Sequence, residues 1–397
     1  MYKFGMKRML KVALFFETTA TNDRKMLCGI AKYSQLYGPW LLYCKRHPFY
    51  MTPGHSMWKQ KVVPELKSWA PDGIIAHVDT KKARDLIALN VPIILGAVTE
   101  PVYLTSSYFA DDSAATSLMA AEYLLSLGFK NFAFCGFQYQ YWSLERRDVF
   151  VKALSKTGYK VDVYNPPKSH SRGFLRDDQV ILSKWLKTLP NPVAVLACND
   201  ARAQQVIDSC HLAGLNVPEE VAVLGIDNDD LICDTTSPPL SSVAWGTEKA
   251  GYEAARLLDN MMSGRKNKPH AIIVSPTHII VRQSTDIFAI EDAEVAKAMN
   301  FIRENRKRQI SVDDAVNATS LGRRALEQRF KKTLNHSIYQ EIRRGCVEQV
   351  AHMLLETSMP VFQIAKTLGY SSSEHIARPF RKEKGMSPQE FRRKYSY

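Results

Sequence analysis

The stretch AVNATSLGRRALEQRFKKTLNHS (residues 315–337) recurs fifty positions later as AKTLGYSSSEHIARPFRKEKGMS (residues 365–387). In each copy a large apolar residue follows the Ala by eleven positions and a Phe follows it by fifteen, with two basic residues directly after the Phe. A repeat of this length is one supersecondary unit used twice. The spacing predicts a short helix, a tight turn and a second helix that crosses the first at the Ala. Two such helix-turn-helix units in tandem indicate a DNA-binding domain.

The helices around the repeat follow from local start and stop signals. Ser311 and Asp314 form a capping-box pattern, Ser320-Leu321-Gly322 supplies the first turn, and Pro360 fits the first turn of a helix. Gly385 ends the last predicted helix. The expected helices cover, in order, residues 291–305, 311–319, 323–334, 339–357, 361–368 and 372–384.

Basic residues are concentrated in the second half of each copy. The chain carries a net charge of +13, and residues 321–344 and 378–394 each hold seven Lys or Arg against two Glu. A basic stretch alone is often only a solvated face. Placed on a repeated helix-turn-helix, the same charge favours double-stranded DNA as the partner.

The length of 397 residues is too great for one compact domain, and a hydrophobic content of 45% is that of a globular protein. Seven cysteines without a CxxC pair or metal-ligand spacing fit a reducing cytoplasm and predict no metal site. The run Leu10–Phe16 after Lys7 and Arg8 is expected to be a first strand, because no cleavage site follows it. No window suggests a membrane span. We expect a leader (1–9), a sensor domain (10–285) and a DNA-binding domain (286–397).

Short apolar runs alternate with helical stretches through the first 285 residues. This alternation predicts parallel α/β sheets, and the number of strands favours two similar lobes. The expected strands are residues 12–16, 73–78, 92–95, 131–136, 161–164, 193–197, 221–226, 272–274 and 278–282, and the longest expected helix is 247–262.

Polar residues follow several of these strands, where ligands of parallel sheets bind. Carboxylates, amides and Arg beside aromatic rings suit a polyhydroxylated ligand such as a sugar, although Asp and Asn after a strand can also simply cap the next helix. The predicted ligand-binding residues are Asp23, Arg24, Trp142, Arg146, Asn199, Asp200 and Asp227. For Asp200 both roles, ligand contact and helix cap, stay open.

Several phrases in this region resemble the sensor domains of LacI/GalR-type regulators, which have the periplasmic-binding-protein fold. They are Leu127-Gly128-Phe129-Lys130-Asn131, Cys198-Asn199-Asp200, Leu224-Gly225-Ile226-Asp227-Asn228 and Pro239-Leu240-Ser241-Ser242-Val243. The resemblance implies that Arg146, Asn199 and Asp227 contact the ligand and that the loop holding Asp23 and Arg24 lines the cleft; Trp142 is inferred from its chemistry. That family begins with its own DNA-binding helices, and here about nine residues precede the first strand.

The C-terminal region resembles AraC/XylS-type regulators. The residues that carry this resemblance are Ile364-Ala365, Leu368-Gly369-Tyr370 and the run Phe380-Arg381-Lys382-Glu383-Lys384-Gly385-Met386-Ser387-Pro388. A two-lobed α/β sensor followed by an all-α tandem helix-turn-helix domain is the combination of xylose operon regulators. It implies a cytoplasmic, homodimeric transcription activator that responds to a sugar, best D-xylose, and works with RNA polymerase. A repressor of the same architecture, another sugar and a non-sugar effector stay open. No catalytic signature or cofactor loop points to an enzyme.

In that family the second helix of each motif enters the major groove, and successive grooves lie about 34 Å apart. Counting back from each Phe gives the base-facing positions Arg323, Arg324, Glu327, Gln328, Ser373, Glu374, His375 and Arg378. The basic residues after each Phe (Lys331, Lys332, Arg381, Lys382) are expected to contact phosphates. Leu326, Ile376, Phe330 and Phe380 are expected to face the core. Pro379 lies inside the second recognition helix and is expected to kink it and turn Arg378 away.

Overall fold

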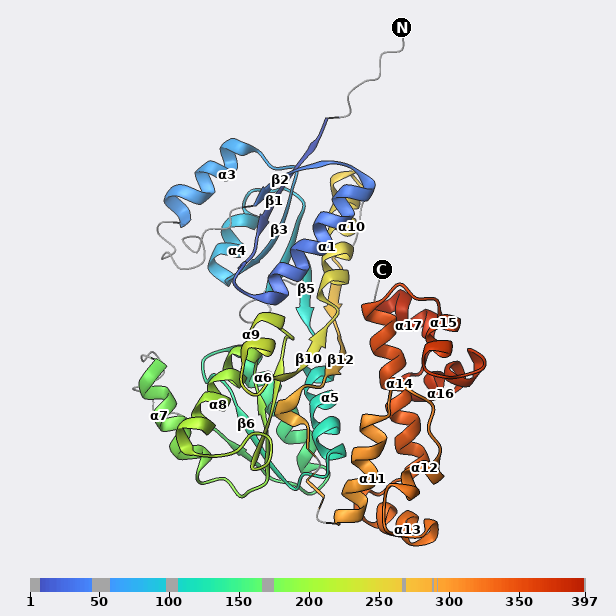
Figure 1. Cartoon of the computed structure of the whole chain (residues 1–397). Coiled ribbons are helices and arrows are strands. Elements are labelled where there is room, and N and C mark those ends of the chain that lie inside the picture. Colours follow the sequence, from blue (N-terminus) through green and yellow to red (C-terminus); the bar gives the residue numbers. More distant parts are fainter. Residues whose placement is uncertain are drawn as a thin grey trace. The chain divides into compact units, whose positions relative to one another are not determined.

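The computed structural model describes residues 8–44, 58–97, 106–165, 175–265, 269–287, 289–290 and 292–395. Residues 1–7 of the expected leader lie outside the described residues. The chain divides into two compact units (Figure 1). Unit 1 comprises residues 1–116, 137–146 and 245–276, and unit 2 comprises residues 117–136, 147–244 and 277–397. Each unit contains a parallel sheet, and unit 2 also contains the helical C-terminal region.

The sheet of unit 1 has the strand order β11-β5-β4-β3-β1-β2. Its strands pair in parallel, which requires a crossover connection between successive strands. The bounds are β1 Leu10–Phe15, β2 Trp40–Cys44, β3 Gly73–Val78, β4 Ile93–Ala97, β5 Ser107–Asp111 and β11 Ala271–Val274. Central strands such as β1 and β3 are buried on both faces, which explains their continuous apolar runs.

Helices cover both faces of this sheet. One face packs on α3 (Val63–Trp69) and α4 (Thr80–Ile87), together with a short turn of π-helix at Trp58–Val62. α1 (Thr21–Tyr37) and α10 (Thr247–Met262) lie side by side and cross closely (Figure 1). A Cβ on Gly29 would collide with the backbone of Glu248, and one on Gly251 with that of Met26, so glycine is required at both positions.

The sheet of unit 2 has the order β12-β10-β9-β8-β6-β7, and β6–β7, β6–β8, β8–β9 and β9–β10 pair in parallel. The bounds are β6 Asn131–Cys135, β7 Val161–Val163, β8 Val193–Ala197, β9 Val221–Ile226, β10 Ser241–Trp245 and β12 Pro276–Ile280. The remaining helices of this α/β part of the chain are α5 (Ser113–Ser126), α6 (Tyr141–Ser155), α7 (Leu175–Leu186), α8 (Asp200–Ala213) and α9 (Asp230–Thr235).

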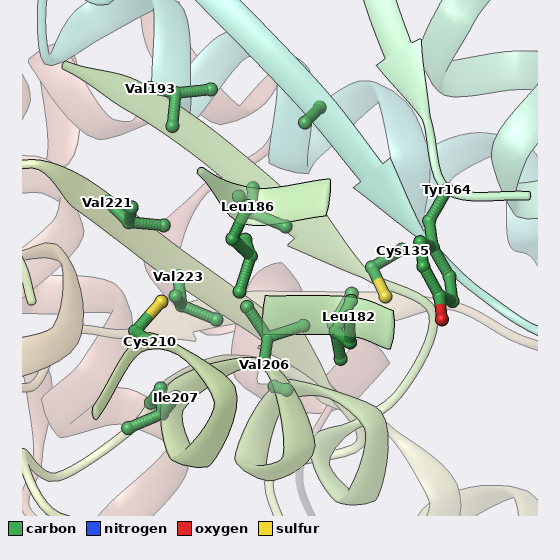
Figure 2. Packing of buried hydrophobic residues seen from close by; sticks show 14 of the residues in the cluster. Cys135, Tyr164, Leu182, Leu186, Val193, Val206, Ile207, Cys210, Val221 and Val223 are labelled. Atoms are coloured by element: carbon green, nitrogen blue, oxygen red, sulfur yellow. The ribbon is translucent and has the colours of Figure 1, made fainter. Parts of the chain in front are cut away.

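A cluster of buried hydrophobic side chains packs α7 and α8 against one face of this second sheet. Figure 2 shows Leu182 and Leu186 from α7 and Val206 from α8 packed against Val193 and Val223. All five are buried to at least 99%. Such burial is worth roughly 1.5–3 kcal/mol for each large aliphatic side chain, so this cluster fixes α8 on the sheet and thereby fixes the residues at the N-terminus of α8.

The C-terminal region is all helical where it is described. Its helices are α11 (Ala293–Glu304), α12 (Val312–Asn317), α13 (Arg323–Leu334), α14 (Ile338–Glu356), α15 (Val361–Thr367), α16 (Glu374–Lys384) and α17 (Pro388–Tyr395). The fifty-residue repeat is visible in its details. Both recognition helices end in left-handed backbone, at Asn335 (φ 60°) and Gly385 (φ 69°), and both are followed by a serine that caps the next helix.

The main difference from the expected elements concerns β2, β5 and β10, which were not predicted as strands, and α9 and α17, which were not predicted as helices. β2 is an edge strand whose Leu41 and Leu42 are both exposed, so it lacks the continuous apolar run of the central strands. β10 begins Ser241-Ser242, and both serines are buried and hydrogen-bonded. Burial of polar residues with partners is invisible in a hydropathy pattern.

Candidate functional site

Asp23 lies in the first turn of α1, beside the carboxyl end of β1. Its side chain is 4% exposed. One carboxylate oxygen accepts a hydrogen bond from the Glu17 backbone N–H (2.5 Å), and the other lies 2.7 Å from Nδ1 of His77. His77 comes from β3, so this contact joins two neighbouring strand ends of the unit 1 sheet. Arg24 donates to the carbonyls of Thr18 and Thr19 in the same loop.

Arg146 is the centre of a second cluster in unit 1. Its guanidinium carbon lies 5.0 Å from the ring centre of Trp142 and 5.3 Å from that of Trp245. Its Nη2 lies 3.3 Å from the Asp111 carboxylate. The side chain is only 3% exposed, and a guanidinium buried to this degree is held by cation–π contacts and its counter-ion. The structure therefore brings the predicted pair Trp142 and Arg146 together.

Asn199 and Asp227 lie at strand ends in unit 2. The Asn199 side-chain oxygen accepts from the Arg202 backbone N–H (2.9 Å), so it caps α8. A cap through the oxygen leaves the amide NH2 to meet a ligand. Asp227 follows β9 directly and has a φ of 113°, a conformation that residues other than glycine rarely adopt.

Asp200 is enclosed within unit 2. Its side chain is 1% exposed, and its two oxygens accept from the Ser242 hydroxyl (2.5 Å) and the Asp229 backbone N–H (2.7 Å). The helix cap is Asn199 and not Asp200, so the capping role left open by the sequence is wrong for Asp200. A direct ligand contact by Asp200 stays a prediction, but both of its oxygens already accept hydrogen bonds from within unit 2.

The first recognition helix, α13, presents one exposed and one buried face. Leu326 and Phe330 are fully buried, as predicted. The predicted DNA-contacting residues of α13 are all exposed: Arg323, Arg324, Glu327, Gln328, Lys331 and Lys332. Arg323 donates to Asp313 (3.0 Å) and Glu327 (3.1 Å), so two predicted base-facing residues are paired with each other.

The second recognition helix, α16, continues through Pro379 rather than ending there. Ile376 and Phe380 are buried, as predicted, and Arg378 remains exposed. Of the other predicted contacts, Glu374, His375, Arg381 and Lys382 are exposed and Ser373 is half-buried. Lys384 at the end of α16 pairs with Glu348 of α14 (2.7 Å), and Glu383 pairs with Arg343. These ion pairs fix α16 on the connecting helix.

Sequence reasoning missed three side chains of these clusters. His77 is not among the predicted ligand-binding residues, although it lies near the end of the correctly predicted strand β3. Asp111 and Trp245 end β5 and β10, two strands that were not predicted. The signal that finds all three is the one used for Asp23 and Asp227, a polar or aromatic residue at the carboxyl end of a parallel strand. Within the described part of the chain no group of three metal-ligating side chains occurs, and no described helix has the length and apolarity to cross a membrane.

A parallel α/β sensor fold and a paired helix-turn-helix on one chain define a ligand-responsive transcription regulator. Residues 121–285 match the periplasmic binding protein-like domain, and residues 315–394 match a helix-turn-helix domain. The chain is 33% identical over 390 residues to the xylose operon regulatory protein of Haemophilus influenzae, covering 96% of this chain and 98% of that protein. It belongs to this family, which consists of transcription regulators and not enzymes, with an AraC-type DNA-binding domain.

Other relatives agree with this assignment. The xylose operon regulatory protein of Escherichia coli K12 is 29% identical over 392 residues, covering 96% of each chain. The solved structure of a xylose-binding transcription activator matches 98% of this chain and 100% of its own, with a TM-score of 0.61 and 27% identity. A transcriptional regulator solved with cellobiose covers 70% of this chain at 23% identity and a TM-score of 0.56, which supports the fold alone.

Proposed function

We propose that this protein is a sugar-responsive transcription activator and that D-xylose is its effector. The sugar class rests mainly on one observation, the buried Arg146 whose guanidinium lies close to the rings of both Trp142 and Trp245. Indole faces cover the C–H surface of a sugar ring, and a guanidinium donates to its hydroxyl oxygens. The Trp245 indole N–H is buried and has no hydrogen-bond partner among the described residues, so it adds a donor where a hydroxyl can accept.

Carboxylates complete the proposed recognition of hydroxyl groups. Asp23 is held rigidly by two hydrogen bonds, and Asp227 is held in an unusual backbone conformation. A carboxylate accepts from sugar hydroxyls, and Asn199 can donate to them. The proposed effector contacts are therefore Asp23, Arg24, Trp142, Arg146, Asn199 and Asp227. The choice of D-xylose is supported by the names of relatives that span the whole chain.

The exposed basic face of the two recognition helices supports binding to double-stranded DNA through two successive major grooves. We place the separate DNA-binding domain at residues 286–397 and the sensor at residues 10–285. We expect the protein to act in the cytoplasm as a homodimer. In this form it would activate a carbohydrate catabolic operon together with RNA polymerase. The effector need favour the DNA-competent state by only a few kcal/mol to switch it.

A thermal-shift screen of the full chain against free pentoses, hexoses and their phosphates tests the proposal. Effector at about 100 times its dissociation constant adds roughly 2.7 kcal/mol to the free energy of unfolding. We expect a rise in Tm with D-xylose that is lost in Arg146→Ala and in Asp227→Ala. A rise with another sugar would replace D-xylose, and no rise with any sugar would remove the sugar class. Transcription in vitro with and without the effector separates an activator from a repressor.

A further inference from the structure

The turn that follows β9 is held in a strained conformation. Asp227 has a φ of 113° and Asn228 a φ of 46°. Two consecutive residues other than glycine at positive φ are uncommon, and such a conformation persists only where the surroundings enforce it. The turn carries Asp227, one of the proposed effector contacts, so the groups that enforce the strain also set the direction of that carboxylate.

Asp200 is the point on which the backbone of this turn converges. The Asp229 N–H donates directly to Asp200 Oδ2 (2.7 Å). The Asn228 N–H donates to Ser242 Oγ (3.0 Å), and the Ser242 hydroxyl in turn donates to Asp200 Oδ1 (2.5 Å). Both amides after Asp227 are therefore held by one carboxylate, one of them directly and the other through a serine.

The surrounding chain leaves room for this carboxylate and for little else. A Cβ on Gly225 of β9 would lie 2.2 Å from Asp200 Oδ1, so any larger residue at 225 would displace the carboxylate. The Cys233 thiol lies 3.5 Å from the other oxygen, Oδ2. Arg282 also holds the turn, because its Nη1 donates to Asn228 Oδ1 (3.0 Å).

We propose that Asp200 is a positioning residue, which holds the strained Asp227–Asn228 turn and thereby aims the Asp227 carboxylate at the effector. It acts through the backbone of Asn228 and Asp229 and does not touch the effector itself. This role of Asp200 rests on the proposed function, because the Asp227 turn matters for binding only if Asp227 contacts the effector.

The charges around Asp200 make this arrangement sensitive to pH. Burial, and then the negative charge of Asp227, raise the pKa of Asp200 to about 8, against the hydrogen bonds from Ser242, Asp229 and Cys233, which lower it. Burial and Asp200 together raise the pKa of the Cys233 thiol well above its ordinary range, so Cys233 stays neutral. Asp230, three residues after Asp227, forms an ion pair with Arg282 (3.5 Å). Ionisation of Asp200 places a second negative charge beside Asp227.

The test uses the full-length chain with the substitutions Asp200→Ala, Asp200→Asn and Gly225→Ala. Asn keeps an acceptor for the Asp229 amide and a donor for Ser242, whereas Ala removes both. Asp208→Asn, on the exposed side of the same helix, is the matched control. Two quantities are measured: amide hydrogen exchange at residues 227–230 without sugar, and the affinity for D-xylose by calorimetry.

We expect faster exchange at residues 228 and 229 in Asp200→Ala and Gly225→Ala, with D-xylose affinity about tenfold or more weaker. Asp200→Asn and Asp208→Asn should match the wild type in exchange and stay within about threefold of it in affinity. Unchanged exchange and affinity in both Asp200→Ala and Gly225→Ala would overturn the proposal, and so would equal loss of affinity in Asp200→Asn and Asp200→Ala. Faster exchange in a protein that never binds D-xylose would contradict the proposed effector and leave the holding of the turn by Asp200 intact.

Discussion

His336 and Glu341 form an ion pair in the first helix-turn-helix motif, with Nε2 of the ring 3.0 Å from the carboxylate. The other ring nitrogen, Nδ1, lies 2.7 Å from the Leu334 carbonyl. Because a carbonyl and a carboxylate oxygen face the two ring nitrogens, this arrangement favours the doubly protonated, positively charged ring. Fifty residues later the corresponding positions hold Met386 and Phe391, so the same place in the second motif is apolar.

The stability of the first motif should therefore depend on pH. The hydrogen bond to Glu341 raises the pKa of His336. Burial alone would raise the pKa of Glu341, but His336 and Arg344 outweigh it and lower that pKa. A raised histidine pKa stabilises the fold fully below about pH 6.5, and this contribution is lost as the pH rises through the higher folded value. We expect the Tm of the wild type to fall between pH 6 and pH 9.

The second motif supplies the control for this prediction. His336→Met alone leaves a buried carboxylate without its partner and should cost about 1–3 kcal/mol. His336→Met with Glu341→Phe copies the second motif, and should recover most of that loss and show a smaller fall in Tm over the same pH range. An equal pH dependence in the double variant and the wild type would show that the pair does not titrate in this range.

Asp200 should add a second pH dependence to the stability of the protein, and the substitution Asp200→Asn should remove it. The folded pKa of about 8 lies above the ordinary value of about 3.9, so the folded state binds the additional proton between these values. Stability should fall as the pH rises through this window and level off above it. The Tm of Asp200→Asn relative to wild type should therefore increase from pH 5 to pH 8; a constant difference would contradict this assignment.

Replacement of Arg146 by lysine should weaken effector binding although the charge is kept. Lysine lacks the planar guanidinium that packs against both indole rings and donates to several acceptors at once. We expect Arg146→Lys to lower the affinity for the sugar about tenfold, measured by calorimetry. Arg147→Lys, at the next position and paired with Asp148 on the surface, is the control and should leave the affinity unchanged.

Loss of a predicted base contact should change the sequence preference for DNA, whereas loss of a predicted phosphate contact should change the affinity for all sequences. Arg324→Ala should cost about 1–3 kcal/mol on the preferred site and relax the preference at one base pair. Lys331→Ala should weaken binding to all sequences alike and reduce the salt dependence by about one unit of slope. Fluorescence anisotropy on matched and single-mismatch duplexes at several salt concentrations separates the two. Loss of base preference in Lys331→Ala would contradict its assignment to phosphate.

Pro379→Ala should stabilise α16. Proline at 379 cannot donate to the carbonyl four residues earlier, and in a helix interior this costs up to about 3 kcal/mol. Because α16 already continues through Pro379 with Arg378 exposed, we expect a higher Tm and an unchanged base preference for the second motif. A lower Tm would mean that the surrounding packing requires the proline.

The repeat could be located closely from the sequence because its signals are local. α13 begins and ends at the predicted residues, and the Ser311–Asp314 capping box is present. The strands β8 and β9, which are fully buried, and β3, which is buried except at His77, also have the predicted bounds. Each is a short apolar run between turn signals, which is the pattern that a strand covered on both faces requires.

The details of the candidate site depend on contacts between distant segments. The pairing of Asp23 with His77 and of Asp200 with Ser242 joins residues 54 and 42 positions apart. No local pattern specifies such pairs. Asp200 shows the consequence: the sequence placed it correctly at a strand end, but only the structure shows that it is turned into the protein, where Gly225 leaves room for it.

In the proposed function one chain couples a sugar to DNA recognition. Selecting binding sites for the full-length protein from a pool of random duplexes, with and without D-xylose, tests this coupling. We expect D-xylose to enrich sites with two conserved elements about one helical turn apart, and Arg146→Ala to abolish this effect of the sugar. Identical enrichment with and without D-xylose, or with any other sugar tested in its place, would contradict it.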